Sequence, residues 1–277
     1  MRSEKDLLAK GLTYLIMAVL LVLFLAPFAI ALINSFKPLD QIILNPLAAP
    51  SQLQWGNYLK AWQALSFPSA LLNTSLITVV SVGLLVLLTA MSSYWITRHH
   101  FGAFVVLEKI ITGTALVPFA TIMLPLVLVI RVMGLINTHA AGILSYVGIG
   151  FPLAYLIMCG GVKAIPLDMD EAATIDGCSA LRTFFSIIVP VMRPTIVTVV
   201  ISDLFWVWNE FQIALIFLNT SKLRTIQLAI NQMFGQFSTK WDIALPGLLI
   251  SLVPILVVFL LLQKHVVAGV MNGAVKG

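Results

Sequence analysis

Charged residues are scarce in this sequence. Only 10% of its 277 residues are Asp, Glu, Lys or Arg, whereas 60% are hydrophobic. Because soluble domains usually contain about 25% charged residues, this composition excludes an ordinary soluble protein. The formal net charge of +5 comes from scattered lysines and arginines. No basic patch alternates with aromatic residues, so nucleic-acid binding is not indicated.

Sequence motifs for nucleotide binding and for catalysis are also missing. The sequence contains no G-x-x-x-x-G-K-[ST] segment, so the chain cannot cradle nucleotide phosphates in the usual way. No serine–histidine or histidine–glutamate pair suggests a protease, and we predict no catalytic residue. Arg98, His99 and His100 are interpreted as a solvated, positive loop end, because no other ligand lies at metal-binding spacing. Cys159 and Cys178 fall in a predicted span and a loop, so a disulfide is not expected.

What the sequence has instead is a set of six long apolar runs, at about residues 14–33, 71–95, 110–130, 140–161, 195–218 and 243–262. About 20 helical residues, rising about 1.5 Å each, span a hydrocarbon core about 30 Å thick. We therefore predict an all-α membrane protein with six transmembrane helices in a single domain, residues 1–277. The first run is longer than the roughly 7–15 apolar residues of a signal peptide, so an uncleaved span is predicted.

The lysines and arginines are unevenly distributed between the predicted loops. Ten of the 16 lie in the N-terminal segment, in the loops after the second and fourth runs, and in the C-terminal tail. Cytoplasmic loops of membrane proteins carry the excess of positive charge. Both termini and the loop at residues 163–193 are therefore predicted to be cytoplasmic.

The loop at residues 163–193 has the pattern of two short helices. Pro166 and Asp168 suit the start of a helix, where a missing N–H and a carboxylate are both tolerated. Gly177 can take the left-handed conformation that ends a helix. A second short helix is predicted after it, because four apolar residues are spaced to share one face: Leu181, Phe184, Phe185 and Ile188.

The same loop contains Glu171-Ala172-Ala173, then Gly177, then Ile187-Ile188-Val189-Pro190 at the end of a nine-residue gap. This order resembles the EAA loop of the membrane subunits of bacterial ATP-binding-cassette (ABC) importers, apart from Val189 at a position where that signature has leucine. The resemblance implies a type I ABC importer permease fold, with a coupling helix that docks into a cleft on a separate ATP-binding subunit. The candidate coupling residues are Glu171, Ala172, Ala173, Asp176, Gly177 and Pro190.

Further segments resemble the carbohydrate branch of that family, the MalG-like permeases. They are Asn34-Ser35-Phe36-Lys37-Pro38, Asn57-Tyr58, Trp208-Asn209-Glu210-Phe211, and Gln263-Lys264 with Gly269 and residues 273–277. The resemblance implies a multi-pass protein of the bacterial cell membrane that works with a second permease subunit, two ATP-binding subunits and an extracytoplasmic sugar-binding protein. ATP and Mg²⁺ would be bound by the partner ATPase subunits, not by this chain. A polyol or glycerol-phosphate cargo and a non-transporting scaffold subunit remain alternatives.

Polar residues interrupt the fifth apolar run. Asp203, Trp206 and Glu210 are spaced i, i+3 and i+7 on one predicted helix face, and Asn209 lies beside them. A charge within a span costs about 3 kcal/mol on insertion scales, so it should face protein or water. We predict that this span lines the translocation path. Its polar residues either contact the sugar through acceptors and an aromatic face, or pack against neighbouring helices and hold an outer gate.

Three other features have two interpretations each. Pro118 and Pro125 in the third run indicate either a kink or a flexible helix that lines a pathway. Residues 219–242 are predicted to face outward and to meet the binding protein, with a solvated connector as the alternative. The aromatic residues of the first external loop are interpreted as an interfacial belt rather than as ligand contacts: Trp55, Tyr58 and Trp62.

Overall fold

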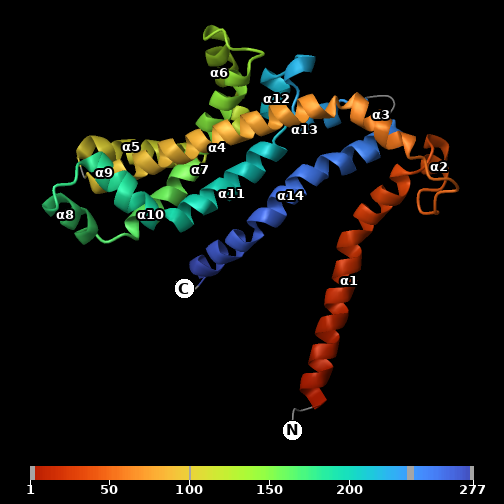
Figure 1. Ribbon diagram of the computed structural model, residues 1–277, viewed down its shortest axis with the longest axis horizontal. Helices are drawn as coiled ribbons and strands as arrows, with labels where there is room; N and C mark the ends of the chain where they lie inside the picture. Colours follow the sequence, from red (N-terminus) through yellow and green to blue (C-terminus); the bar gives the residue numbers. More distant parts are fainter. Residues whose placement is uncertain (1–3, 100, 236–239, 275–277) are drawn as a thin grey trace. The chain divides into compact units, whose positions relative to one another are not determined.

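The computed structural model of the chain describes residues 4–99, 101–235 and 240–274, and most of these residues are helical (Figure 1). His100 and residues 275–277 of the sugar-permease motif lie outside the described residues. The chain divides into two compact units. Unit 1 contains Met1–Phe67 and Ala229–Pro254, and unit 2 contains Pro68–Leu228 and Ile255–Gly277. The single permease domain over residues 1–277 stays a prediction.

Four helices in the described ranges are long and apolar enough to cross a membrane by themselves. They are α1 (Glu4–Ser35), α4 (Phe67–Arg98), α7 (His139–Lys163) and α14 (Trp241–Ala274). They correspond to the first, second, fourth and sixth predicted spans. Two bent pairs of helices bring the number of candidate spans to as many as six, which fits the predicted all-α permease fold.

The third predicted span, residues 110–130, is sharply bent, as the kink interpretation of its prolines predicts. The structure has α5 (Gly102–Thr114) and α6 (Phe119–Val132), which are bent by 111° relative to one another. Pro118 is the residue before α6 and has extended backbone angles. Proline lacks an N–H and disfavours helical geometry at the residue before it, so the helix cannot continue through this position. Pro125 lies inside α6 without ending it.

The fifth predicted span, residues 195–218, is also divided. α11 (Arg193–Asn209) ends where Glu210 takes an extended conformation, and α12 (Gln212–Phe217) follows. Before α11, the chain forms α10 (Val189–Val191), and the segment Ala180–Val191 is bent by 76° from α11. The polar sequence around Glu210 therefore marks a break in the helix rather than a continuous polar face.

Unit 1 is organised by the loop that follows α1. It contains α2 (Leu39–Leu44) and α3 (Gly56–Ala64). The fully buried Lys37 donates from Nζ to Oδ1 of Asn34 at 2.8 Å and to the carbonyls of Asn45 and Pro46 at 3.0 and 3.1 Å. Phe36 packs against Trp55, with ring centroids 4.9 Å apart. Nearly all the side chains of α1 between Lys10 and Ile33 are exposed.

Unit 2 is built around α7, which packs against α5, α6, α11 and α12. Lipid tails are as apolar as leucine, so helices in a membrane associate through close packing and small residues rather than through a hydrophobic driving force. Gly150 of α7 lies against Trp206 and Leu85, and Gly161 lies against Thr195. Short elements η2 (Ser221–Leu223) and α13 (Ile226–Asn231) follow α12.

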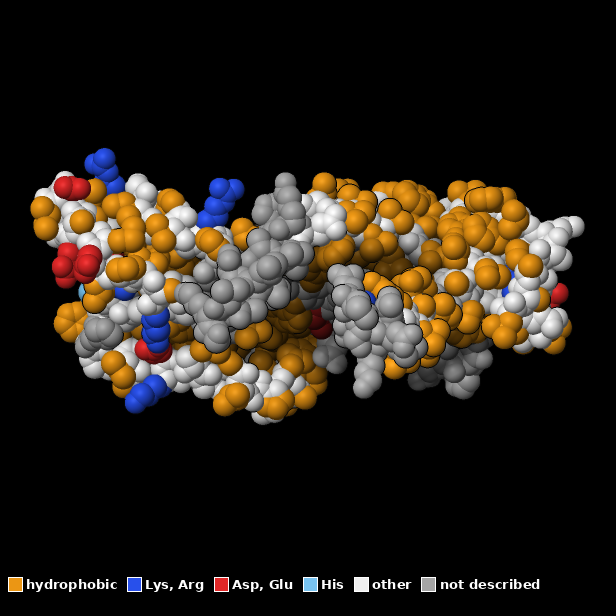
Figure 2. Space-filling view, turned by 90° about the horizontal axis from the view of Figure 1, so that it is seen from below, with side chains coloured by type: hydrophobic (Ala, Val, Ile, Leu, Met, Phe, Trp, Pro, Cys, Tyr) orange, Lys and Arg blue, Asp and Glu red, His pale blue; other side chains and the backbone are white. Residues whose placement is uncertain are grey.

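In Figure 2, hydrophobic side chains are abundant on the described surface, and many of the charged side chains of unit 2 lie at the end that carries α8 and α9. The exposed apolar residues of unit 2 include Leu72, Leu124 and Leu153. A surface of this kind is unfavourable in water and favourable in lipid. The distribution agrees with a membrane protein whose charged loop lies outside the apolar part.

Candidate functional site

The predicted coupling loop consists of short helices at one end of unit 2. They are α8 (Asp168–Ile175), α9 (Ala180–Thr183), the π-helical turn η1 (Phe184–Ile188) and α10. Three acidic residues, Asp168, Asp170 and Glu171, lie in the first turn of α8. Negative charge at this end is favourable because the helix dipole is positive there.

α8 ends as the sequence predicts. Gly177 has a φ of +75°, a conformation that costs glycine little because it has no Cβ. The N–H groups of Gly177 and Cys178 donate to the carbonyls of Thr174 and Ala173 at 3.0 and 2.9 Å. This pair of bonds is the Schellman motif, which satisfies the last carbonyls of a helix. Ser179 caps the next helix, α9, because its Oγ accepts from the N–H of Arg182 at 3.4 Å.

Most of the candidate coupling residues face outward. Ala173 is buried, whereas the others are exposed: Glu171, Ala172, Asp176, Gly177 and Pro190. Of the predicted apolar face on the second helix, Phe184 and Ile188 are buried and Leu181 and Phe185 are exposed. The chain therefore presents an acidic, small-residue helix and two apolar side chains on the surface of this segment.

The end of α4 holds α8 through an ion pair that the sequence analysis missed. Nε of Arg98 lies 2.9 Å from Oδ2 of Asp170, and the two side chains are only 9% and 18% exposed. Arg98 also donates to the carbonyl of Ile165 at 3.0 Å, and the hydroxyl of Tyr94 donates to Oδ1 of Asp170 at 2.6 Å. The interpretation of Arg98 as a solvated loop end is thus wrong. The i, i+4 spacing of Tyr94 and Arg98 is the signal that could have indicated a shared role.

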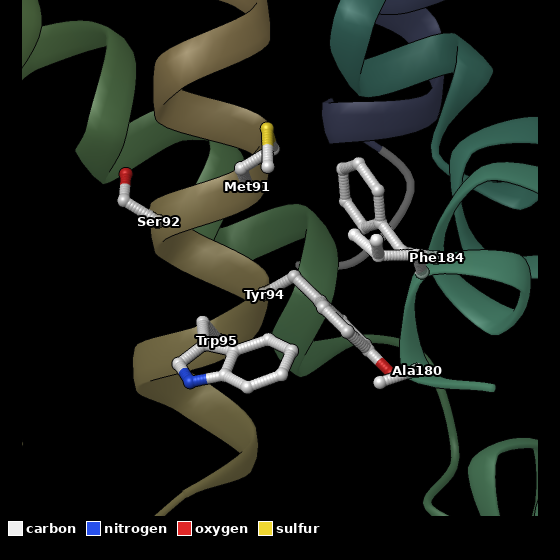
Figure 3. A pocket seen from close by; sticks show the side chains of 7 residues that line it. Met91, Ser92, Tyr94, Trp95, Ala180 and Phe184 are labelled. Atoms are coloured by element: carbon white, nitrogen blue, oxygen red, sulfur yellow. The ribbon is translucent and has the colours of Figure 1, made fainter.

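Two cavities lie beside this ion pair. One of about 220 Å³ has an apolar lining that includes Trp95, Leu181 and Phe184 (Figure 3). The rings of Tyr94 and Phe184 border it and pack together, with centroids 5.4 Å apart. The second cavity, of about 400 Å³, is lined by residues of α4 and α8 that include Arg98, Asp170 and Glu171. α8 is therefore separated from α4 by open space beside the ion pair.

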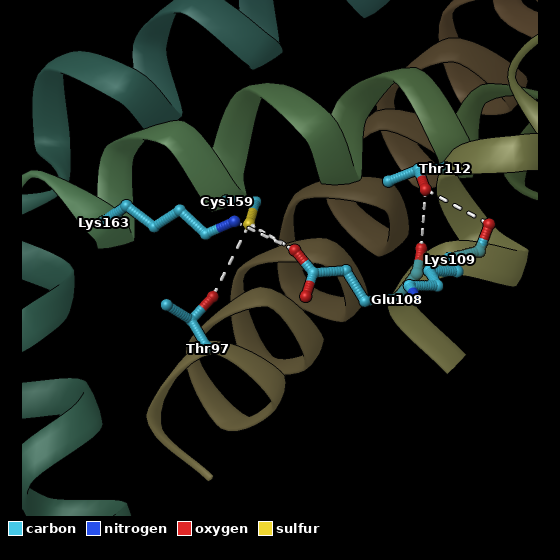
Figure 4. A network of polar contacts seen from close by, with 6 residues as sticks. All are labelled: Thr97, Glu108, Lys109, Thr112, Cys159 and Lys163. Carbon is cyan, nitrogen blue, oxygen red and sulfur yellow. Dashed lines mark hydrogen bonds and ion pairs between the residues drawn. The ribbon is translucent and has the colours of Figure 1, made fainter. Parts of the chain in front are cut away.

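A second polar network joins α4, α5 and α7 (Figure 4). Nζ of Lys163 lies 2.9 Å from Oε1 of Glu108, and Sγ of Cys159 lies 3.7 Å from the same oxygen. Oγ1 of Thr97 lies 3.5 Å from Sγ of Cys159. Cys159 and Cys178 are both free thiols. Among the described residues, no group of three His, Cys, Asp or Glu side chains is placed to hold a metal ion.

Two of the predicted path residues contact α7: Trp206 from within α11, and Glu210 from the break after it. Oε2 of Glu210 accepts from the Tyr146 hydroxyl at 3.0 Å and from the N–H of Ile213 at 2.9 Å, while Oε1 accepts from the N–H of Gln212 at 2.6 Å. The ring of Trp206 meets that of Tyr146 edge-on, with centroids 5.9 Å apart. Glu210 thus caps the start of α12 and ties it to α7.

The other two path residues have different surroundings. Asp203 lies within α11 and is only 5% exposed. Asn209 is exposed at the end of α11, where its amide donates to the carbonyl of Phe205 at 2.8 Å. Its Oδ1 accepts from Nε2 of Gln227 at 3.3 Å. Of the four residues, Asn209 is the one that the described chain leaves on the surface.

Comparisons with known proteins agree with this arrangement. Residues 6–272 match the family of binding-protein-dependent transport system inner membrane components. The chain is 34% identical over 258 residues to the probable starch degradation products transport system permease protein AmyC of Thermoanaerobacterium thermosulfurigenes, covering 93% of this chain and 94% of that protein. It is 30% identical to the melibiose/raffinose/stachyose import permease protein MelC of Bacillus subtilis, with 91% of each chain covered.

A solved structure supports the same fold. It is the crystal structure of a bacterial ABC transporter involved in the import of the acidic polysaccharide alginate. One of its chains superimposes with a TM-score of 0.80 at 16% identity, covering 95% of this chain and 98% of that one. At this level of identity, the similarity supports the fold and not the cargo.

Proposed function

The chain belongs to the family of binding-protein-dependent inner membrane components, as a MalG-like carbohydrate ABC importer permease, and from this premise we propose how it is coupled and assembled. It pairs with a second homologous permease subunit and two ATP-binding subunits, and it receives its cargo from an extracytoplasmic sugar-binding protein. It is a multi-pass membrane subunit and not an enzyme. ATP and Mg²⁺ are bound by the partner ATPase subunits.

The observation that carries this proposal is the exposed helix α8. Its acidic Glu171 and small Ala172 face outward, and Gly177 turns the chain sharply after it. Small side chains permit close approach of a partner surface, and the acidic first turn offers a partner charge to recognise. We assign this surface as the binding site of the ATPase subunit. When ATP binding closes the ATPase dimer, the movement of that subunit displaces α8. Both termini are then cytoplasmic with α8, which the distribution of lysine and arginine supports.

The divided fifth span supplies the path or the gate. Trp206 and Glu210 both contact Tyr146 of α7, and this favours packing and gating over sugar contact for these two residues. Asn209 is exposed and offers both a donor and an acceptor, which suits contact with a sugar hydroxyl. Asp203 is assigned to packing because it is buried within unit 2.

The loop at residues 219–242 is proposed to face outward and to meet the binding protein. A cysteine at Gln232, which is exposed, is expected to cross-link to the binding protein in at least one nucleotide state. Gln236, a second position suited to this test, lies outside the described residues. No cross-link in any nucleotide state would support the solvated connector instead.

The experiment that tests the proposed function is transport by the complete assembly in lipid vesicles. The chain is purified with its second permease and ATPase subunits, and uptake of labelled sugars is measured with and without ATP and the binding protein. We expect uptake of an oligosaccharide that requires both. Uptake of only a polyol or glycerol phosphate would show that the cargo is not a carbohydrate. An assembly that transports none of these solutes would favour a scaffold subunit.

A further inference from the structure

We propose that Tyr94 and Arg98 form a joint that transmits movement of the coupling helix α8 into α4. The inference rests on the proposed function, because it gives these residues a positioning role in an ATP-driven importer. Both residues lie outside the coupling-loop motif and on a different helix. The joint is defined as Tyr94 and Arg98 of α4 together with Asp170 of α8.

The joint holds the coupling segment at three successive points. Arg98 donates to the carbonyl of Ile165, just after α7 ends. Arg98 and Tyr94 together engage both carboxylate oxygens of Asp170, at 2.9 and 2.6 Å. The Tyr94 ring packs against Phe184 at the start of η1. Three points of the segment, at Ile165, Asp170 and Phe184, are therefore attached to adjacent turns of one helix.

The contacts of Asp170 differ in kind from the other contacts of α8. Met169 and Ala173 provide the apolar contacts of this helix, and such contacts permit sliding because they have no preferred direction. The Tyr94 hydroxyl donates a hydrogen bond to the charged carboxylate of Asp170, and such bonds are short and directional. Arg98 adds an ion pair to the second carboxylate oxygen. The exposure of only 9% and 18% also limits competition from water. A displacement of α8 is therefore passed to α4 mainly through Asp170.

The neighbouring space supports the same conclusion. The cavity of about 400 Å³ lies beside the joint and is lined by Thr174 and Cys178 on one side and by His99 on the other. A continuous apolar interface would fill this space. The polar joint, rather than tight packing, thus connects the two helices here.

Charge distribution favours the joint at both helix ends. Arg98 lies in the last turn of α4 and Asp170 in the first turn of α8. A cation at a helix C-terminus and an anion at a helix N-terminus are each favourable to their own helix dipole. The ion pair therefore links the C-terminus of α4, which stabilises the positive charge of Arg98, to the N-terminus of α8, which stabilises the negative charge of Asp170.

The test uses the complete importer in lipid vesicles and measures sugar imported per ATP hydrolysed. For Arg98→Gln and Asp170→Asn, we expect the ATPase subunit to co-purify normally and ATP hydrolysis to continue. Sugar imported per ATP should fall about tenfold, the scale of one lost charge-assisted hydrogen bond. Tyr94→Phe keeps the ring packing but removes the hydroxyl that donates to the Asp170 carboxylate, so it should also cause a loss of about tenfold.

The matched control is Lys163→Gln. It breaks an ion pair of the same length, 2.9 Å, that is more exposed, joins α7 to α5 and does not involve α8. We expect unchanged sugar import per ATP. The joint is overturned if the three joint variants import as much sugar per ATP as the wild-type chain, or if Lys163→Gln lowers this ratio equally.

A distance measurement separates failure of the joint from failure of the proposed function. Spin labels at Met91 of α4 and Ile175 of α8, both exposed, are introduced after Cys159 and Cys178 are changed to serine. On ATP binding, the distance should stay constant in the wild-type background and change in Arg98→Gln. A distance that changes equally in both backgrounds overturns the joint. A wild-type assembly that hydrolyses ATP without importing any sugar contradicts the proposed function instead, while the labels still report on the joint.

Discussion

The hydroxyl of Tyr146 donates a hydrogen bond to Oε2 of Glu210 at 3.0 Å, and this contact connects α7 to the break between α11 and α12. The same carboxylate accepts from the backbone N–H groups of Gln212 and Ile213. A charged group in a span is costly unless it is paired. Here three donors converge on it, so its first role is to stabilise the broken helix.

Glu210→Gln is therefore expected to destabilise the protein. The amide that replaces one carboxylate oxygen cannot accept from an N–H, so at least one donor loses its partner, at a cost of about 2 kcal/mol. Tyr146→Phe should cost about 1 kcal/mol. Thermal unfolding of the purified assembly measures both changes. Sugar preference should stay fixed, and a normal melting temperature with an altered preference would assign Glu210 to the cargo.

Trp206→Ala and Asn209→Ala should separate packing from cargo contact. Trp206 packs on Tyr146 and Gly150, so its truncation should cost about 3 kcal/mol of stability and leave the order of preferred sugars unchanged. Asn209 is exposed, so its truncation should change the half-saturation of transport with little effect on unfolding. Transport assays over a sugar panel, together with melting curves, distinguish the two effects. Identical half-saturation in both variants would remove cargo contact for both residues.

Close packing of α7 on α11 makes a third prediction possible. A Cβ on Gly161 would lie 2.5 Å from Oγ1 and 2.9 Å from Cβ of Thr195. Gly161→Ala should therefore push the helices apart and destabilise the protein by about 1–3 kcal/mol. Gly160→Ala is the matched control, because nothing lies within 4 Å of its added Cβ. Equal melting temperatures for the two variants would contradict the packing described for Gly161.

Several parts of the fold were predictable because they depend on local chemistry. The apolar runs that became α1, α4, α7 and α14 follow from composition and length alone. The end of α8 at Gly177 follows from the one residue type that takes a positive φ at little cost. In both cases the residues of the element itself are sufficient to predict where it forms or ends.

The remaining features depend on residues that are distant in sequence. The third and fifth runs are apolar enough to be taken as single spans. Pro118 indicated a kink in the third run, but only the backbone shows how far the chain bends after Thr114 and that the fifth run breaks after Asn209. Asp170 lies in the first turn of α8, and its partners Tyr94 and Arg98 lie on the second span, with the third and fourth spans between them in the sequence. Pairing of this kind is set by the tertiary arrangement, for which a single sequence contains no periodic signal.

The coupling helix gives the fourth prediction. Gly177→Val places a β-branched residue at a φ of +75°, a conformation that is strongly disfavoured for such residues. The Schellman turn should be lost, and the ATPase subunit should co-purify poorly or hydrolyse ATP without sugar uptake. Gly177→Asn is the control, because asparagine tolerates this conformation.

Glu171→Ala tests the charge of the same helix. It should weaken ATPase binding without unfolding α8, because Glu171 is exposed and alanine is a good helix former. Co-purification of the ATPase subunit and sugar uptake in vesicles measure the effect. The coupling assignment would be contradicted by full uptake and full co-purification in both the Gly177→Val and the Glu171→Ala variants.

Lys37 provides the last prediction, in unit 1. Its ammonium group is fully buried and donates to three oxygens, those of Asn34, Asn45 and Pro46. Lys37→Met keeps most of the side-chain volume but leaves these buried acceptors without the charge that holds them together. The free energy of unfolding should fall by about 3 kcal/mol. The buried oxygens would lose their donor while remaining shielded from water, so their desolvation would no longer be compensated.

The loss should be local, because the three oxygens belong to the end of α1 and the loop that follows it. Faster amide hydrogen exchange and faster proteolysis between residues 38 and 56 are the expected signs. Lys60→Met is the matched control, because Lys60 is exposed on α3 and its removal should change neither rate. If Lys37→Met exchanges and is cleaved at the rate of Lys60→Met, the buried ammonium does not organise this loop, and the aromatic contacts of Phe36 with Trp55 are sufficient to hold it.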